Sequence, residues 1–131
     1  MNAFLVDLEN KPGELARVTE AIAAKGVNIT NLTGTTCGSS GRLLLTTDNE
    51  SATRAALSAS NCTFETKELV ETPMRHQPGA LAAVARRLAN AGINIEAMCP
   101  TGMQGQDLTV GFVTDQPART KELLSHATMS G

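Results

Sequence analysis

The sequence repeats itself at a spacing of 66 residues, and this duplication constrains the fold more than any other feature of the chain. The segment NKPGEL at residues 10–15 returns as HQPGAL at 76–81, and GVNI at 26–29 returns as GINI at 92–95. Nine residue pairs within residues 12–29 and their counterparts are identical in this register: Pro12/Pro78, Gly13/Gly79, Leu15/Leu81, Ala16/Ala82, Val18/Val84, Ala23/Ala89, Gly26/Gly92, Asn28/Asn94 and Ile29/Ile95. The chain is therefore predicted to form two domains, at residues 1–67 and 68–131, each near the lower size limit for folding alone.

The pattern of the first domain predicts the element order βαββαβ. Strands are predicted at residues 3–8, 27–33, 42–47 and 63–67, with a hairpin connection at 37–41. A helix is predicted from about residue 13 to residue 25, with Leu15, Val18 and Ile22 as its buried stripe and Gly26 as its stop. A second helix, capped by Asp48 or Ser51, is expected to end near residue 59.

The second domain repeats this order with little or no linker. Strands are predicted at 69–74, 93–99 and 108–113, with a loop at 100–106, and Leu81, Val84 and Leu88 form the helix stripe. The counterpart of the fourth strand would begin only near residue 130, so that strand is expected to be short or missing. The predicted fold is α+β, with two ferredoxin-like βαββαβ units in tandem, whose antiparallel sheets carry their helices on one face.

A strand without its usual neighbour has consequences for assembly. In a ferredoxin-like sheet the fourth strand flanks the first, so the strand at 69–74 is expected to lie at an exposed edge. Pro73 suits such a strand, because proline has no N–H to donate to a neighbour on either side. Either Pro73 blunts the edge or a second chain covers it, and we expect the second outcome, a homodimer.

Composition and charge bear on the class of partner. The formal net charge is −2, so no basic excess points to nucleic acid or to anionic lipid. No apolar run approaches the length that spans a membrane, and no signal-peptide pattern opens the chain. The cysteines Cys37, Cys62 and Cys99 suit free thiols in a reducing compartment. A cytoplasmic location is therefore expected.

The two Pro-Gly loops and the asparagines that follow them are the candidate binding features. Proline fixes a turn and glycine lets the chain enter the helix, so a single copy needs no functional explanation. A helix N-terminus also offers N–H groups to a carboxylate. Asn28 and Asn94 fall in predicted strands, where asparagine is disfavoured. The alternative explanation is an amide that bonds local backbone.

No group of residues in the sequence predicts catalysis. His76 and His126 lack metal-ligand spacing to any cysteine or acidic residue. The glycine-rich segment 38–41 lacks the lysine of a phosphate-binding loop. We therefore expect no enzymatic activity, no cofactor and no metal.

With these elements and motifs, the whole chain resembles tandem ACT-domain proteins. That family comprises small ferredoxin-like modules that bind amino acids and regulate amino-acid metabolism, and their ligands lie between paired modules. The resemblance implies a non-catalytic sensor or regulatory subunit that binds a free amino acid, with a metabolic enzyme or a transcriptional regulator as a further candidate partner. The second copy departs from the family pattern at His76, where the first keeps Asn10.

The resemblance also implies which residues bind. Those in the first domain are Asn10, Pro12, Gly13, Glu14, Leu15, Asn28 and Ile29. Those in the second are His76, Gly79, Ala80, Leu81, Asn94 and Ile95. Strand alternation further suggests Thr30, Leu32, Glu96 and Met98 as a lining for the ligand's side chain.

Two alternatives to an amino-acid sensor remain open at the level of sequence. The first is an interaction protein that keeps the fold but has no ligand. The second is an RNA-binding protein, because RNA recognition motifs share the βαββαβ order. Such motifs stack bases on aromatic side chains, and the predicted central strands offer almost none, which disfavours the second alternative.

Overall fold

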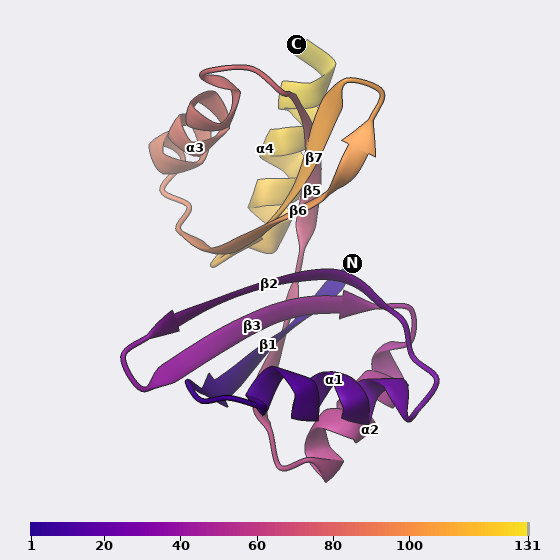
Figure 1. The fold of residues 1–131 in the computed structure, drawn as a ribbon. Helices are drawn as coiled ribbons and strands as arrows, with labels where there is room; N and C mark the ends of the chain where they lie inside the picture. The colour runs from indigo at the N-terminus through magenta and orange to yellow at the C-terminus, as the bar shows by residue number, and fades with distance from the viewer. Residues whose placement is uncertain (131) are drawn as a thin grey trace. The chain divides into compact units, whose positions relative to one another are not determined.

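The computed structural model describes residues 1–130 of the chain, with side chains for residues 1–125. Its internal contacts divide the chain into two compact units, at residues 1–67 and 68–131. Each unit is α+β, with a small antiparallel sheet of four strands in unit 1 and three in unit 2 (Figure 1). The predicted fold class is confirmed.

Unit 1 has the predicted order βαββαβ. Its elements are β1 (Asn2–Glu9), α1 (Glu14–Ala23), β2 (Ile29–Cys37), β3 (Ser40–Thr47), α2 (Glu50–Ala59) and β4 (Thr63–Glu68). The strands lie in the order β2-β3-β1-β4, so β2 and β4 are the edges of the sheet. Both helices lie against one face of this sheet (Figure 1). Most residues of the edge strand β2 are exposed to solvent.

The core of unit 1 lies between the sheet and its helices. Phe4 and Val6 of β1 pair with Leu45 and Leu43 of β3, and all four side chains are buried. Val18 and Ile22 of α1, together with Leu57 of α2, complete this cluster and are fully buried. Because paired residues of an antiparallel ladder share a face, this register identifies which side of every neighbouring strand faces the helices.

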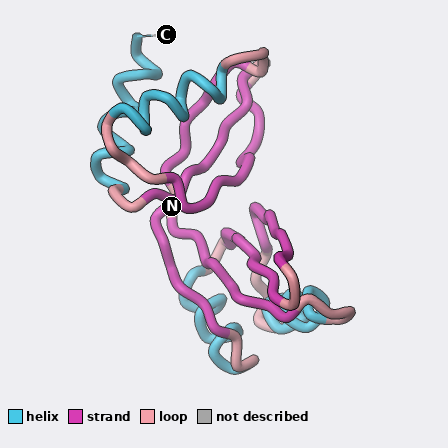
Figure 2. Tube along the Cα trace, turned by 90° about the vertical axis from the view of Figure 1, so that its left-hand side faces the viewer, coloured by secondary structure: helices cyan, strands magenta, loops and turns pink. Residues whose placement is uncertain are grey.

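Unit 2 repeats the order without a fourth strand among its described residues. Its elements are β5 (Val70–Arg75), α3 (Ala80–Asn90), β6 (Ile95–Gln104), β7 (Asp107–Thr114) and α4 (Pro117–Ser130). The strand order β5-β7-β6 leaves β5, which contains Pro73, at an edge as predicted. Both helices lie on one side of the strands (Figure 2). The core contains Val70, Leu88, Phe112 and Leu124.

The repeated glycines explain why both units form the same loop-helix-loop. Gly13 and Gly79 have φ of 90° and 88°, and Gly26 and Gly92 have φ of 72° and 73°. This left-handed region is open to glycine and strained for residues with a Cβ. Each pair therefore fixes the backbone at the start or the end of a helix, as the motif predicts.

Two residues predicted for the buried helix stripes are exposed. The side chains of Leu15 and Leu81 are 49% and 44% exposed, although their partners Val18 and Leu88 are fully buried. Both leucines lie in the first turn of their helix, and neither belongs to the apolar cluster of its unit. The predicted stripe is wrong at these two positions.

Several element boundaries also differ from the prediction. Asn28 and Asn94 precede β2 and β6 instead of lying in them. The hairpins are tighter than expected, because residues 37 and 40 belong to strands and β6 extends to residue 104 through the predicted loop. The cap of α2 is Asn49, whose side chain accepts from Ala52 N–H at 3.0 Å, and not Asp48 or Ser51.

Candidate functional site

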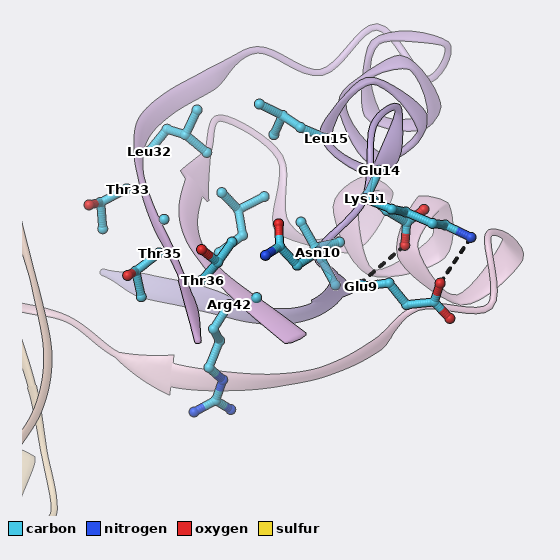
Figure 3. Close-up of a pocket in the computed structure, with 14 residues that line it drawn as sticks. Glu9, Asn10, Lys11, Glu14, Leu15, Leu32, Thr33, Thr35, Thr36 and Arg42 are labelled. Atoms are coloured by element: carbon cyan, nitrogen blue, oxygen red, sulfur yellow. Dashed lines mark hydrogen bonds and ion pairs between the residues drawn. The ribbon is translucent and has the colours of Figure 1, made fainter. Parts of the chain in front are cut away.

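Unit 1 contains a cavity of about 410 Å³ beside the loop that joins β1 to α1 (Figure 3). It is lined by the end of β1, the loop, the first turn of α1, the second half of β2 and the start of β3. The lining residues are Leu8, Glu9, Asn10, Lys11, Glu14, Leu15, Leu32, Thr33, Gly34, Thr35, Thr36, Gly41, Arg42 and Leu43. Asn10, Glu14, Leu15 and Leu32 were among the residues that the sequence predicts for a ligand site.

Strand register gives this cavity an apolar floor. Gly34 pairs with Leu43 and Leu32 pairs with Leu45, so both β2 residues lie on the helix face of the sheet. Thr33 and Thr35 alternate to the other face, and Figure 3 shows their side chains pointing away from the cavity. Arg42 also points away and pairs there with Asp7, at 3.2 Å, and with Glu65.

Two glycines on the floor of the cavity lie close to neighbouring side chains. A Cβ added at Gly34 would lie 3.2 Å from Leu43 Cδ1 and 3.5 Å from the carbonyl oxygen of Arg42. A Cβ at Gly41 would lie 3.3 Å from Thr36 Cγ2. A larger residue at either glycine would therefore press on Leu43 or Thr36 at the wall of the cavity.

Two leucines flank the opening. Leu15 of α1 and Leu32 of β2 point toward one another across the cavity (Figure 3), and they are 49% and 46% exposed. Their counterparts in unit 2, Leu81 and Met98, are 44% and 39% exposed. The duplication thus leaves the same two apolar positions uncovered in both units.

Polar groups gather on the loop side of the cavity. The Asn10 amide donates from Nδ2 to the Gly38 carbonyl at 2.9 Å, and Asn10 N–H donates to the Ser39 carbonyl at 2.9 Å. These bonds tie the loop to the β2–β3 hairpin. Within the described part of the chain, Asn10 Oδ1 accepts no hydrogen bond. Lys11 Nζ lies 2.9 Å from Glu9 Oε2, with both side chains largely exposed.

Glu14 occupies the start of α1 and is already satisfied by the protein. Its carboxylate accepts from Glu9 N–H at 3.3 Å and from Arg17 Nε at 3.0 Å. These two donors, Arg17 first, hold the pKa of Glu14 below its ordinary value. Arg17 also donates to the Ser60 carbonyl at 2.8 Å. Sequence reasoning missed Arg17, although its i,i+3 spacing from Glu14 is a recognisable signal.

Asn28 lies at the other end of α1 from Asn10 and does not line the cavity. α1 has 10 residues, which corresponds to about 15 Å at 1.5 Å per residue. Asn28 N–H donates to Asp48 Oδ1 at 3.0 Å, and Asp48 N–H returns to the Asn28 carbonyl at 3.1 Å. One unit therefore cannot bring the Asn10 and Asn28 side chains to the same small molecule.

The same reciprocal pair of hydrogen bonds between an asparagine backbone and an aspartate, which we call a latch, recurs in unit 2. Asn94 N–H donates to Asp115 Oδ1 at 3.0 Å, and Asp115 N–H returns to the Asn94 carbonyl at 3.2 Å. Neither Asp48 nor Asp115 was predicted to act in this way. Their common position after the third strand of each unit, offset by 67 residues, was the available signal.

Unit 2 has no copy of the unit 1 cavity at its own loop among the cavities described. A cavity of about 450 Å³ lies instead between β5 and α3, and of the predicted site residues it contains only Ala80. The chemistry of the loop has also changed, with His76 for Asn10 and Ala80 for Glu14. Pro100 stands in β6 where β2 has Gly34. His76, Gly79, Leu81, Asn94 and Ile95 are not brought together around that space.

Within the described residues, no group of three or more His, Cys, Asp or Glu side chains could hold a metal ion. The side chain of His126 lies outside those described. No helix in the described part of the chain combines the length and apolar character needed to cross a membrane.

Comparison with known proteins relates this geometry to a family. Residues 3–57 match the family model of the ACT domain. Protein BT0572 from Bacteroides thetaiotaomicron has 25% sequence identity and a TM-score of 0.81, over 96% of this chain and 87% of its own. No curated protein sequence matches significantly.

Two aspartate kinase regulatory subunits share the fold at lower identity. The ligand-free subunit from Thermus thermophilus has 16% identity and a TM-score of 0.66, over 96% of this chain and 90% of its own. The subunit from Thermus flavus has 16% identity and a TM-score of 0.67, over 98% and 90%. Residues 3–57 of this protein are thus similar to the ACT domain, and the chain with its two units shares the fold of these solved structures.

Proposed function

We propose that this protein is a non-catalytic regulator that binds a free amino acid at the cavity of unit 1. The observation that carries the proposal is the concave, apolar cavity bordered by the polar loop of an ACT domain. Small-molecule sites typically combine a mostly apolar wall with a few convergent polar groups. The free cysteines fit action in the cytoplasm, where thiols stay reduced.

The loop side of the cavity has the groups that an amino acid backbone requires. Asn10 Oδ1 is an acceptor for the ligand ammonium, while Nδ2 of the same amide is held by Gly38. The N–H groups at the positive end of α1 suit the ligand carboxylate. Glu14 keeps its carboxylate on Arg17 and Glu9, so it does not compete with the ligand for these groups.

A second module completes the site in this proposal. Asn28 lies about 15 Å from the loop along α1, too far to reach a ligand that Asn10 holds. A homodimer would let Asn28 of one copy approach the loop of another. Sedimentation at micromolar concentration tests this, because a single species at 13.7 kDa, with and without amino acids, would contradict the dimer.

The experiment that tests amino-acid binding is a thermal-unfolding screen of the intact protein against each of the twenty amino acids. A ligand that binds only the native state stabilises it by mass action, by about 2.7 kcal/mol at a concentration 100 times Kd, and so raises the unfolding midpoint. At least one amino acid is expected to raise the midpoint. No response to any of the twenty would reject amino-acid binding.

The role of Asn28 has its own test. Asn28→Ala is expected to weaken binding of the amino acid that the screen identifies by roughly 1.5–3 kcal/mol, the usual value of a hydrogen bond to a charged group. Its side chain makes no hydrogen bond within the described residues, so the unfolding midpoint without ligand should stay unchanged. Asn31→Ala, which removes the hydrogen bond from Asn31 Nδ2 to Thr46 Oγ1 at 2.8 Å, is a control for the loss of a nearby amide outside the proposed site. Equal affinity for Asn28→Ala and the parent protein by isothermal titration would remove Asn28 from the site.

Asn10 carries the second predicted contact, and its substitution needs a stability correction. Asn10→Ala removes both the Oδ1 acceptor proposed for the ligand ammonium and the Nδ2 donor to Gly38, so both binding and stability should fall. Binding measured well below the variant's own unfolding midpoint separates the two effects. Affinity that remains unchanged there would reject Asn10 as a ligand contact.

A protein-interaction module of the same fold is the alternative function. The observation that favours it is the pair of exposed apolar positions in each unit, Leu15 with Leu32 and Leu81 with Met98. Exposed apolar patches often mark protein contacts. A metabolic enzyme or a transcriptional regulator is the partner we propose for either function.

A further inference from the structure

We infer that the unit 1 cavity selects an aliphatic amino acid, and that Gly34 sets the upper size of the side chain it accepts. This inference rests on the proposed function and adds the chemical class of the ligand. Three observations support it: the register of β2 and β3, the ion pairs around the cavity, and the close contact between Gly34 and the Leu43 side chain.

The surface that would contact the ligand side chain is aliphatic. Leu8, Leu32 and Leu43 line it from the sheet, and Leu15 faces them from α1. Gly34 and Gly41 expose only backbone and α-carbon between these leucines. A branched aliphatic side chain placed there would cover Leu15 and Leu32, which are otherwise about half exposed. No aromatic residue lines the cavity, so nothing in its wall favours stacking with a ring.

The charges near the cavity disfavour a charged ligand side chain. Glu9 pairs with Lys11, and Glu14 pairs with Arg17. Arg42 lines the cavity with its backbone, while its guanidinium forms ion pairs with Asp7 and Glu65 on the other face of the sheet. A lysine or aspartate side chain lying on the leucine floor would therefore be buried without a partner, which is strongly unfavourable.

Gly34 is the position where one added methyl group would change the volume of this floor. The added Cβ would lie 3.2 Å from Leu43 Cδ1, at the flexible end of that side chain, so the strand can accommodate alanine with a small shift. The methyl, and the shift of Leu43 Cδ1 that it forces, would change the wall of the cavity, which Gly34 and Leu43 both line. Unit 2 has Pro100 at the equivalent position.

Isothermal titration of the intact protein tests the ligand class. The aliphatic set is leucine, isoleucine, valine, methionine and alanine, and the comparison set is lysine, aspartate, threonine and phenylalanine. The aliphatic amino acids should bind, with leucine or isoleucine at least tenfold tighter than alanine. Tighter binding of a charged, hydroxylated or aromatic amino acid would overturn the inference and leave amino-acid binding intact. No binding by any amino acid in this set or in the full screen of twenty would instead reject the proposed function.

Gly34→Ala tests the role of the glycine. This substitution should lower the affinity for leucine roughly tenfold, in line with the effect of one methylene in an apolar pocket. It should change the affinity for alanine by less than about threefold. Thr35→Ala is the matched control, since Thr35 points away from the cavity on the same strand (Figure 3), and it should leave the leucine-to-alanine ratio unchanged. A Gly34→Ala protein that keeps the parent ratio, or weakens all ligands equally, would refute size selection by Gly34.

Discussion

At the residue scale, Glu14 shows how one side chain can belong to the fold and border the site. Its carboxylate joins the end of β1, through Glu9 N–H, to the first turn of α1, through Arg17. Arg17 then reaches the Ser60 carbonyl beyond the end of α2. An acidic residue in the first turn also complements the helix dipole. The loop beside the cavity is therefore held by a carboxylate that must stay ionised.

This arrangement predicts a pH-dependent stability. Because Arg17 and Glu9 N–H lower the folded-state pKa of Glu14 below its ordinary value of 4.5, ionised Glu14 stabilises the fold above that value. The contribution is lost as pH falls through the lowered folded-state pKa. In urea titrations, Glu14→Gln should destabilise the protein at pH 7, and the difference should shrink as pH falls below about 4.5. Glu20→Gln, on an exposed part of α1, is the control for removing a negative charge from the same helix. A Glu14→Gln difference independent of pH would contradict the interpretation.

The paired latches make a second prediction for single residues. Asp48→Ala and Asp115→Ala each remove the carboxylate that accepts the N–H of Asn28 or Asn94. Each substitution should lower the free energy of unfolding by about 1 kcal/mol, the usual net value of one hydrogen bond. Asp48→Asn and Asp115→Asn keep an acceptor oxygen and should recover part of the loss. Chemical denaturation checks the values, and a loss in one unit without a similar loss in the other would show that the latches are not equivalent.

The sequence predicts some of the site and misses the rest for reasons that concern single residues. Asn10 and Leu15 belong to a motif and were named from it. Gly34 and Leu43 belong to no motif, and they matter only because strand register brings them to one face. Asn28 was grouped with Asn10 because a linear pattern does not reveal that α1 separates them.

At the element scale, helix ends were predicted well and strand ends poorly. Glycines with positive φ stop or start a helix through backbone geometry alone, so Gly13 and Gly26 mark their positions in the sequence. Strand ends depend on pairing with a partner. β2 and β6 run several residues further than predicted because each has β3 or β7 to pair with along its whole length. Register shifts near Ile29 and Ile95 further break simple alternation.

The edge strand β5 gives a prediction at this scale. Pro73 pairs in register with Thr109 of β7 and removes one N–H from a strand that has no second neighbour among the described residues. Pro73→Thr would restore that donor and a residue that favours strands. The variant should self-associate more strongly than the parent at the same concentration, as measured by sedimentation. Thr72→Val, whose side chain is on the buried face, is the control, and unchanged association of Pro73→Thr would show that the proline does not blunt the edge.

At the scale of the whole molecule, the protein has a separate apolar cluster in each unit. Ile22 and Leu88 occupy equivalent positions in the repeat, and each is fully buried in its own cluster. Neither cluster shares a residue with the other. The duplication therefore produces two cores of the same design, which the 66-residue repeat predicts.

Independent cores predict independent effects on stability. Ile22→Ala and Leu88→Ala should each cost about 2–5 kcal/mol, the range for large-to-small substitutions in a packed core. The losses in the double variant should add to within about 0.5 kcal/mol, because the two sites have no packing partner in common. Chemical denaturation of the two single variants and the double variant gives this comparison. A larger interaction energy would mean that the two cores respond as one.

The left-handed glycines of the second unit have an evolutionary consequence. A gene duplication frees one copy to drift, and the two halves of this chain have since diverged at His76, Ala80 and Pro100. The drift spared Gly79 and Gly92, whose backbone angles match those of Gly13 and Gly26 to within a few degrees. Unit 2 therefore differs from unit 1 in the chemistry of its loop and keeps glycine at the positions where the backbone is left-handed.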